Sequence, residues 1–222
     1  MKHPVTSKID FSNFYLLKDS ELNQIQEFLR NASLKTARKG EIIYSKSETS
    51  KVFFVLSGAI KLVDIRESGT EVVKDILMEN DMFGGFSFDQ KTSHYEYAKT
   101  LTSRATYFTI DLNQFRQILK DNPSISYNFY RILSHKINRL EDRYSNLAFN
   151  DTRNRLLHFL KGMGTKESTN SNGTLAIKNF LTQSEMAKMI YVSRQTLSRA
   201  LKDLRNSGEL IYTRNKIEIK TN

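Results

Sequence analysis

The segment LTQSEMAKMIYVSRQTLSRALKDL, residues 181–204, predicts two short helices joined by a tight turn. Thr182 and Glu185 have the spacing of a capping box, in which a hydroxyl and a carboxylate satisfy the first backbone N–H groups of a helix. Ser193 is a second helix-start signal, and the turn before it is too short for anything except two helices at a steep angle. Apolar residues at i, i+3, i+4 and i+7 predict the buried stripe of the second helix: Leu197, Ala200, Leu201 and Leu204. This pattern is typical of a DNA-binding helix-turn-helix.

The opposite face of the second predicted helix is polar and rich in hydrogen-bond donors. Arg194 and Gln195 lie at its N-terminus, the end from which a recognition helix reaches base edges in the major groove. Arginine pairs with guanine, and glutamine with adenine, through two hydrogen bonds each. The alternative is an ordinary helical hairpin with a solvated basic face. The expected DNA-binding residues are Thr182, Ser184, Ser193, Arg194, Gln195, Thr196, Ser198, Arg199, Lys202, Arg214 and Lys216.

The positive charge is concentrated in the C-terminal third. The 222-residue chain has a net charge of +10; from Asp151 onward 13 Lys+Arg face 6 Asp+Glu (net +7), whereas the first 150 residues carry 21 against 18 (net +3). Such a distribution is expected of a module that faces phosphates, although a generic basic surface is the alternative.

The region from Gly40 to Leu112 has a period of two and predicts an all-β unit. Runs of β-branched and aromatic residues are separated by Gly and Ser-Gly turns at intervals of roughly ten residues, which is typical of a jelly roll. A helix is expected ahead of it, over residues 19–30. The runs predicted as strands are 41–44, 52–56, 59–63, 71–76 and 106–110.

Asn122 and Pro123 predict the start of a long helix, because proline is favoured at the first helical position. Its apolar residues alternate steps of three and four, as in the seam of a two-stranded coiled coil. We favour a dimer seam, since a two-fold helix-turn-helix protein can read two half-sites; the alternative is a helix packed on its own β domain. The expected dimer interface is Tyr130, Leu133, Ile137, Leu140, Tyr144 and Leu147.

The C-terminal region begins with another capped helix and ends in a predicted β-hairpin. Asn150 and Asp151 cap an amphipathic helix, and a polar loop follows over residues 162–173. After the second helix of the helix-turn-helix, Gly208 ends the helix and residues 210–219 read as two strands around a turn. Arg214 and Lys216 at this turn are suited to phosphate contacts, as in the wing of a winged helix.

The lack of cysteine and of any long apolar run excludes several classes of protein. The chain has no cysteine, which excludes disulfides, Cys-ligated zinc and Cys-bound iron–sulfur clusters. No apolar run is long enough for a membrane span or for the core of a secretion signal, so a soluble cytoplasmic protein is expected.

The ordered set of motifs resembles the cyclic-AMP receptor protein/fumarate–nitrate regulator (Crp/Fnr) family of bacterial transcription factors over nearly the whole chain. The motifs are VLSGAIK (55–61), NDMFG (80–84), the long helix, DTRNRL (151–156) and VSRQTLSR (192–199). The resemblance implies an α+β fold: an N-terminal β-roll (a jelly roll like a cyclic-nucleotide-binding domain) in residues 1–121, a dimerisation helix in 122–149 and a winged helix-turn-helix in 150–222. It also implies a homodimer on palindromic DNA, with RNA polymerase as a partner if the protein is an activator.

The sequence departs from the family pattern in three regions. Arg194 and Arg199 match the guanine-reading positions, but Gln195 stands where many members have Glu, so the half-site is expected to differ. Tyr191 occupies a turn position that is usually glycine. After Gly84 the family's ribose-binding Glu is missing, and the Arg-Ser or Arg-Thr pair for a cyclic phosphate is replaced by aromatic and acidic residues. We therefore expect no cyclic-nucleotide dependence, because a buried phosphate needs a guanidinium partner.

Other effectors remain open. The chain is expected to need no cofactor and no metal, and to be a regulator, not an enzyme; the alternatives are an unidentified small ligand or haem in the β-roll, with His94, His135 or His158 as axial ligands. A cupin-type metalloenzyme is a remote alternative, since it needs clustered ligands and the roll contains only His94. The possible effector-pocket residues are Gly84, Phe86, Ser87, Tyr95 and Tyr97.

Overall fold

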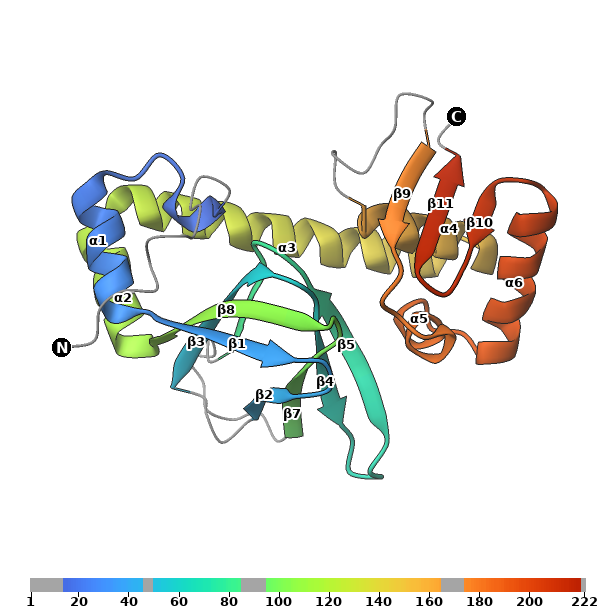
Figure 1. Cartoon of the computed structure of the whole chain (residues 1–222), viewed down its shortest axis with the longest axis horizontal. Coiled ribbons are helices and arrows are strands. Elements are labelled where there is room, and N and C mark those ends of the chain that lie inside the picture. The colour runs from blue at the N-terminus through green and yellow to red at the C-terminus, as the bar shows by residue number, and fades with distance from the viewer. Residues whose placement is uncertain (1–13, 46–49, 85–94, 165–173, 221–222) are drawn as a thin grey trace. The chain divides into compact units, whose positions relative to one another are not determined.

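The computed structural model describes residues 14–45, 50–84, 95–164 and 174–220, which form two compact units (Figure 1). The first unit comprises Met1–Glu71 with Asp75–Ile137, and the second comprises Val72–Lys74 with Asn138–Asn222. No helix of the described residues is long and apolar enough to cross a membrane.

Apart from Val72–Lys74, the first unit contains a β-roll of two four-stranded sheets, with strand orders β1-β8-β3-β6 and β2-β7-β4-β5. The pairings β1/β8, β3/β8, β3/β6, β2/β7 and β4/β7 are antiparallel. This architecture confirms the expected β-roll. The strands are β1 (Ser33–Arg38), β2 (Ile42–Ser45), β3 (Lys51–Ser57), β4 (Ile60–Ile65), β5 (Glu71–Leu77), β6 (Met82–Gly84), β7 (Tyr95–Thr100) and β8 (Arg104–Asp111).

Helices flank the roll at both ends of its sequence. A short 3-10 helix (Tyr15–Leu17) and α1 (Leu22–Asn31) precede it, and α2 (Leu112–Asp121) and α3 (Pro123–Phe149) follow it. The helix α1 begins three residues later than the expected residue 19. The helix α3 begins at Pro123 as expected, but the Asn122 side chain does not cap it: its amide donates to the Ile118 carbonyl at 2.9 Å and to Glu27 at 3.1 Å, at the end of α2.

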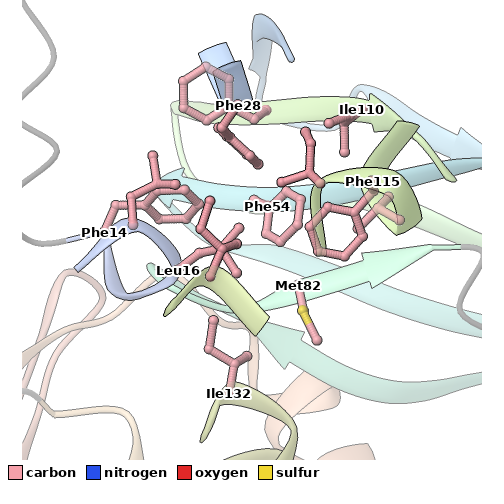
Figure 2. Close-up of a cluster of buried hydrophobic side chains, with 13 residues drawn as sticks. Phe14, Leu16, Phe28, Phe54, Met82, Ile110, Phe115 and Ile132 are labelled. Carbon is pink, nitrogen blue, oxygen red and sulfur yellow. The ribbon is translucent and has the colours of Figure 1, made fainter. Parts of the chain in front are cut away.

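Strand β3 is covered on both faces, which accounts for its continuous apolar sequence. Successive side chains of a strand point to opposite faces. Phe53 and Val55 belong to a cluster between the two sheets, with members from both. Val52 and Phe54 belong to a second cluster, in which the helices pack on the outer face of the β1-β8-β3-β6 sheet (Figure 2).

Phe54 is at the centre of an aromatic network in this outer cluster. Its ring centroid lies 5.9 Å from that of Phe14, 5.8 Å from that of Phe28 and 5.3 Å from that of Phe115, each in an edge-to-face arrangement. Each such pair contributes roughly 0.5–1.5 kcal/mol beyond the area that it buries. Because Phe14, Phe28 and Phe115 come from the N-terminal segment, α1 and α2, the network fastens three flanking segments to one strand.

The helix α3 buries one face in the same cluster. Ile125 is fully buried and Ile132 is 8% exposed. Between them, the buried Asn128 donates its side-chain amide to the carbonyls of Leu16 at 3.3 Å and Lys18 at 2.6 Å. The alternative that α3 packs on its own β domain is therefore correct for this face of the helix.

The second unit is a winged helix-turn-helix. It contains α4 (Thr152–Gly162), α5 (Gln183–Met189) and α6 (Arg194–Asn206), and a three-stranded sheet of order β10-β11-β9. The strands are β9 (Thr174–Lys178), β10 (Leu210–Tyr212) and β11 (Lys216–Lys220), all paired antiparallel. Asp151 caps α4 as expected, its carboxylate accepting from the Asn154 N–H at 2.8 Å.

The sequence patterns missed one helix and several strands. Strands β1, β6, β7 and β9 and helix α2 were not expected. Strand β6 has three residues and β1 has mostly exposed, polar side chains, so neither carries the apolar alternation from which strands are predicted. These strands form because neighbouring strands offer backbone hydrogen bonds to them.

Gly58 shows a steric requirement in the turn between β3 and β4. Its φ is +85°, and a Cβ atom at this position would lie 2.6 Å from the Arg104 carbonyl oxygen and 2.7 Å from the Thr102 hydroxyl. Only glycine adopts this φ without strain and allows such an approach.

Replacing Phe54 with alanine should lower the free energy of unfolding by about 3–5 kcal/mol, because it leaves a cavity at the centre of the network. Urea denaturation of the full chain measures the change. Leu22→Ala is the matched control, since Leu22 is 71% exposed and its truncation should cost well under 1 kcal/mol. Equal decreases in the free energy of unfolding for the two variants would show that the aromatic network does not contribute specially to stability.

Candidate nucleic-acid interface

Two side-chain caps determine where the helices of the helix-turn-helix begin. The Thr182 hydroxyl accepts from the Glu185 N–H at 3.2 Å, and the Glu185 carboxylate accepts from the Thr182 N–H at 3.0 Å, which confirms the capping box. The Ser193 hydroxyl accepts from the Thr196 N–H at 3.1 Å and starts α6. These caps satisfy N–H groups that the helices leave without intrahelical partners.

The apolar stripe of α6 lies in the interior, as expected from its spacing. Leu197 and Leu204 are fully buried, Leu201 is 5% exposed and Ala200 is 7% exposed. Since one face of α6 is thus packed against its own unit, the opposite face is directed outward. The polar residues expected on it are exposed: Arg194, Gln195, Thr196, Ser198, Arg199 and Lys202.

The exposed cations of α6 are available for a ligand. Within the described part of the chain, no hydrogen bond or ion pair holds the side chains of Arg194, Arg199 or Lys202. The hydroxyls of Ser193 and Thr196 lie 2.8 Å apart and bond to each other. Arg194 and Gln195 are the first two residues of α6, so their side chains project from the positively polarised end of the helix. This arrangement can donate hydrogen bonds to base edges and phosphates.

Thr182 and Ser184, at the start of α5, are also exposed. The Thr182 hydroxyl already accepts from the Glu185 N–H and donates to its carboxylate at 2.9 Å. A phosphate contact by Thr182 would therefore have to share a hydroxyl that holds the capping box together.

The wing is a short hairpin with a basic turn. Strands β10 and β11 pair with Leu210 opposite Ile219, and the turn is closed by the Thr213 N–H donating to the Lys216 carbonyl at 2.9 Å. Arg214 and Lys216 are both exposed, as expected. Lys216 forms an ion pair with Glu218 on the same strand, so a phosphate would compete with this carboxylate.

Asn179 positions the wing turn and was missed by sequence reasoning. It is 8% exposed; its side-chain amide donates to the Thr213 carbonyl at 3.0 Å, and its backbone N–H donates to the Asn215 carbonyl at 2.9 Å. Its side-chain oxygen accepts from the Leu181 N–H at 3.2 Å. One buried amide thus links the wing turn to the residue before the helix-turn-helix. The only signal in the sequence was an asparagine after an alternating strand, which is common in loops.

The base of the wing is tied to α4 and α6. Glu209 forms an ion pair with Arg153 of α4 and accepts from the Ser207 hydroxyl at 2.5 Å. The Ser207 hydrogen bond, and then the Arg153 guanidinium, hold the pKa of Glu209 below its usual value. The carboxylate is therefore ionised at neutral pH, as its ion pair with Arg153 requires.

The apolar residues of α3 that do not face the outer cluster form an exposed stripe. We define this stripe by five residues that recur along one side of the helix: Tyr127 (64% exposed), Tyr130 (68%), Ile137 (55%), Leu140 (52%) and Tyr144 (74%). Of the other two expected seam residues, Leu133 is half-buried and packs on the outer cluster, and Leu147 is half-buried. Tyr127 was not part of the expected interface. The same helix therefore has one packed face and one exposed apolar side.

The expected effector-pocket residues do not all reach the roll interior. Phe86 and Ser87 lie outside the described residues, and so does His94. On β7, Ala98 belongs to the interior cluster, so strand alternation places Tyr97 on the outer face, where its hydroxyl donates to Glu71 at 2.8 Å. Tyr95 is the first residue of β7 and lies opposite Ile65.

Position 84 requires glycine because the backbone of β3 lies too close for a Cβ atom. The two candidate haem ligands among the described residues lie on the surface. Gly84 has a φ of +108°, and a Cβ there would collide with the Lys51 carbonyl oxygen of β3. His135 on α3 and His158 on α4 are both exposed. No group of three or more His, Cys, Asp or Glu that could hold a metal ion occurs among the residues that the structure describes.

Comparison with known proteins gives two family matches. Residues 34–122 match the cyclic nucleotide-binding domain, and residues 154–221 match the Crp-like helix-turn-helix domain. The chain is 27% identical over 172 residues to the CRP-like cAMP-activated global transcriptional regulator of Mycobacterium tuberculosis, covering 77% of this chain and 76% of that protein. It is 29% identical over 184 residues to the global nitrogen regulator of Nostoc sp., covering 82% of each.

A solved structure shows the same fold. The c-di-GMP responsive global regulator CLP of Xanthomonas campestris matches with a TM-score of 0.71 at 18% identity, over 91% of this chain and 100% of that one. All three of these similar proteins are described as regulators. At this low identity, the structural match is informative about the fold alone.

Tyr191 in the turn between α5 and α6 has a φ of 56°, which is strained for a residue with a Cβ. Replacing it with glycine should raise the free energy of unfolding by about 0.5–1 kcal/mol, because the relieved strain exceeds the extra entropy of glycine in the unfolded chain. Urea denaturation tests this. Tyr191→Ala keeps the Cβ and is the matched control; a gain as large as that of Tyr191→Gly would assign the effect to the exposed ring instead of the backbone.

Proposed function

The chain belongs to the Crp/Fnr family of transcription regulators, and from this premise we propose that it binds a palindromic DNA site as a homodimer without needing a cyclic nucleotide. Its helix-turn-helix is of the DNA-binding kind found in that family. The single observation that carries the proposal is the state of α6: its apolar stripe is buried, whereas Arg194, Gln195 and Arg199 are exposed.

Base reading is proposed for three residues at the N-terminal half of α6. Arg194 and Arg199 can each bind guanine through O6 and N7, and both guanidinium groups are free of partners in the described part of the chain. Gln195 can bind adenine N6 and N7, whereas a glutamate at this position would accept from cytosine N4. Lys202, one to two turns further along α6, and Arg214 and Lys216 at the wing turn are assigned to phosphates, which supply affinity without sequence information.

The exposed stripe of α3 supports a homodimer. Five large apolar side chains in a single stripe are costly to leave in water, since burial contributes about 25 cal/mol per Å². The stripe repeats with the steps of a coiled coil, so a second copy related by a two-fold axis could pack the same residues against each other. Two half-sites about one helical turn apart would then match two recognition helices.

Independence of cyclic nucleotides is supported by the residues of β7. The chain has Tyr95-Glu96 where a guanidinium and a hydroxyl for a cyclic phosphate would be expected from the family pattern. A phosphate buried beside a carboxylate is repelled by it and lacks a compensating charge. RNA polymerase is a further proposed partner if the protein activates transcription.

Alanine at Arg194 or Arg199 should weaken binding to the specific site by roughly 1–3 kcal/mol and leave binding to random DNA nearly unchanged. Fluorescence anisotropy, with an operator that the wild type selects from randomised duplexes, measures both affinities. Gln195→Glu should move the preferred base opposite this residue from adenine toward cytosine.

Two controls accompany this measurement. Arg214→Ala should weaken specific and random binding alike and reduce the salt dependence, as expected for a phosphate contact. Lys161→Ala, at an exposed position of α4 outside the helix-turn-helix, should change neither affinity. Equal losses on specific and random duplexes for the two α6 arginine variants would contradict the base-reading assignment.

Leu140→Glu should convert the dimer into monomers, because the two-fold seam would then bury like charges facing each other. Analytical ultracentrifugation measures the mass, and anisotropy measures the expected loss of affinity for the palindrome. His135→Glu adds the same charge at an exposed position of α3 away from the stripe and should leave the dimer intact. A wild-type chain that sediments as a monomer at micromolar concentration would refute the homodimer.

Cyclic AMP and cyclic GMP at millimolar concentration should change neither the melting temperature nor the affinity for the operator. A ligand at 100 times its dissociation constant would add about 2.7 kcal/mol to stability, which a thermal melt detects readily. Tight binding to the operator only in the presence of a cyclic nucleotide would overturn this part of the proposal.

A further inference from the structure

The junction between α3 and α4 is two residues long, and one side chain spans it. Helix α3 ends at Phe149 and α4 begins at Thr152. The guanidinium of Arg155, the fourth residue of α4, donates from Nε to the Asn150 carbonyl at 2.8 Å and from Nη2 to the Leu147 carbonyl at 3.0 Å. The two helices are thus bonded to each other through a side chain as well as through the backbone that joins them.

The chemistry of arginine suits this position. The end of a helix leaves its last four carbonyl groups without intrahelical partners, and it is negatively polarised. A guanidinium carries its donors in a rigid planar fork, so it can hold two acceptors in fixed positions. Arg155 is half-buried, and its bonds to the carbonyls are charge-assisted, which makes them stronger than neutral hydrogen bonds. These bonds therefore restrict the rotation of α4 about the end of α3.

Both residues of the junction are themselves held by hydrogen bonds. The Asn150 side-chain amide donates to the side-chain oxygen of Asn146 at 2.6 Å, and the Asn150 N–H donates to the Asn146 carbonyl at 3.1 Å. On the other side, the Asp151 carboxylate caps α4, and the Asp151 carbonyl accepts from the Arg155 N–H at 3.0 Å. The junction is therefore a fixed corner and not a loose linker.

This corner lies between the two surfaces that the proposed function uses. The C-terminal part of α3, with Leu140 and Tyr144 of the exposed stripe, belongs to the same compact unit as the helix-turn-helix. Beyond the corner, α4 packs against α6, and its Leu156 and Leu160 are fully buried. The path from the stripe to the recognition helix therefore runs through the junction that Arg155 spans.

A small rotation at this junction is large on the scale of DNA. Helix α4 has 11 residues, which gives a length of about 16 Å. A rotation of about 12° at its start would displace its other end by roughly 3.4 Å, which is the rise of one base pair. Because a palindrome is read by two copies, the separation of the two recognition helices is sensitive to the angle between α3 and α4.

We propose that Arg155 is a positioning residue that fixes the angle between α3 and α4 and thereby makes the protein select operators by the spacing of their half-sites. This role rests on the homodimer and the DNA binding proposed above. Arg155 acts through the carbonyls of Leu147 and Asn150, not through a contact with DNA. An apolar side chain of similar length would leave these carbonyls to water and allow α4 to rotate.

The angle can be measured without DNA, because the chain contains no cysteine to compete for a spin label. Labels are attached at Ser145→Cys on α3 and Asp203→Cys on α6, two exposed positions of the same unit, and the labelled chain is diluted with unlabelled chain. Double electron–electron resonance should give a narrow distance distribution when Arg155 is present. Arg155→Met, which keeps the length of the side chain but has no donor, should widen this distribution by about twofold or more.

Operators with one base pair added or removed between the half-sites measure the consequence for DNA binding. Fluorescence anisotropy should show that the wild type binds both at least about tenfold more weakly than its selected operator. In Arg155→Met this penalty should fall to about threefold or less, because the selected operator loses the advantage of a preset angle, and the affinity for a duplex with a single half-site should not change. Arg155→Lys, whose ammonium lacks the fork, should give an intermediate penalty.

Arg153→Met is the matched control. Arg153 is also an arginine of α4, but it forms an ion pair with Glu209 within the winged helix-turn-helix and makes no bond to α3 among the described residues. Its replacement should leave both the distance distribution and the spacing penalty as they are in the wild type.

An unchanged distance distribution or an unchanged spacing penalty in Arg155→Met would overturn the proposal. Equal losses on every duplex, the single half-site included, would also overturn it, since Arg155 would then serve the stability of the unit as a whole. Arg155→Lys carries both measurements if Arg155→Met does not fold, and failure of both variants to fold would likewise make the residue a structural element.

The proposed function is tested separately by the binding of the wild type to its selected operator. A wild type that binds this operator without any preference for spacing keeps the proposed function and refutes the role of Arg155. A wild type that binds no palindrome refutes the proposed function and the spacing role together, and the distance measurement then still reports whether Arg155 fixes the angle between α3 and α4.

Discussion

The burial of one face of α3 in the aromatic cluster around Phe54 is the interaction on which the arrangement of the first unit depends. Phe54 brings together the N-terminal segment, α1 and α2, and Ile125 and Ile132 attach α3 to the same cluster (Figure 2). Once this face of α3 is packed, helical geometry leaves the apolar stripe that includes Tyr130 and Leu140 in solvent. The same cluster that completes the fold thus also defines the surface that we propose for dimerisation.

In the helix-turn-helix and the wing, structural contacts fix the backbone, whereas the cationic side chains of α6 stay exposed. Caps from Thr182 and Ser193 and the buried leucines of α6 orient that helix without using any of its exposed cations. The wing is braced separately through Asn179 and through the Glu209 ion pair with Arg153. Because these structural contacts do not use the exposed side chains of Arg194, Gln195 and Arg199, the three remain available for the DNA contacts that we propose.

The interior of the β-roll is mainly apolar but includes two acidic positions on neighbouring strands. Most interior positions are filled by apolar residues, as a packed core requires. Asp64 and Glu96 interrupt this pattern in a place where two strands bring them opposite each other. Such acidic residues depart from the apolar pattern that strand packing favours.

The sequence by itself determined the local features: the capping box at Thr182, the apolar stripe of α6, the helix start at Pro123 and the strained turn at Tyr191 are all properties of a few neighbouring residues. Only the tertiary structure decided which faces meet. Tyr97 was expected in a pocket, but strand pairing directs it outward and directs Glu96 inward, and Leu133 of the expected seam packs on the outer cluster instead. The physical reason is that capping and periodicity depend on local contacts, whereas strand register and burial depend on partners distant in the sequence.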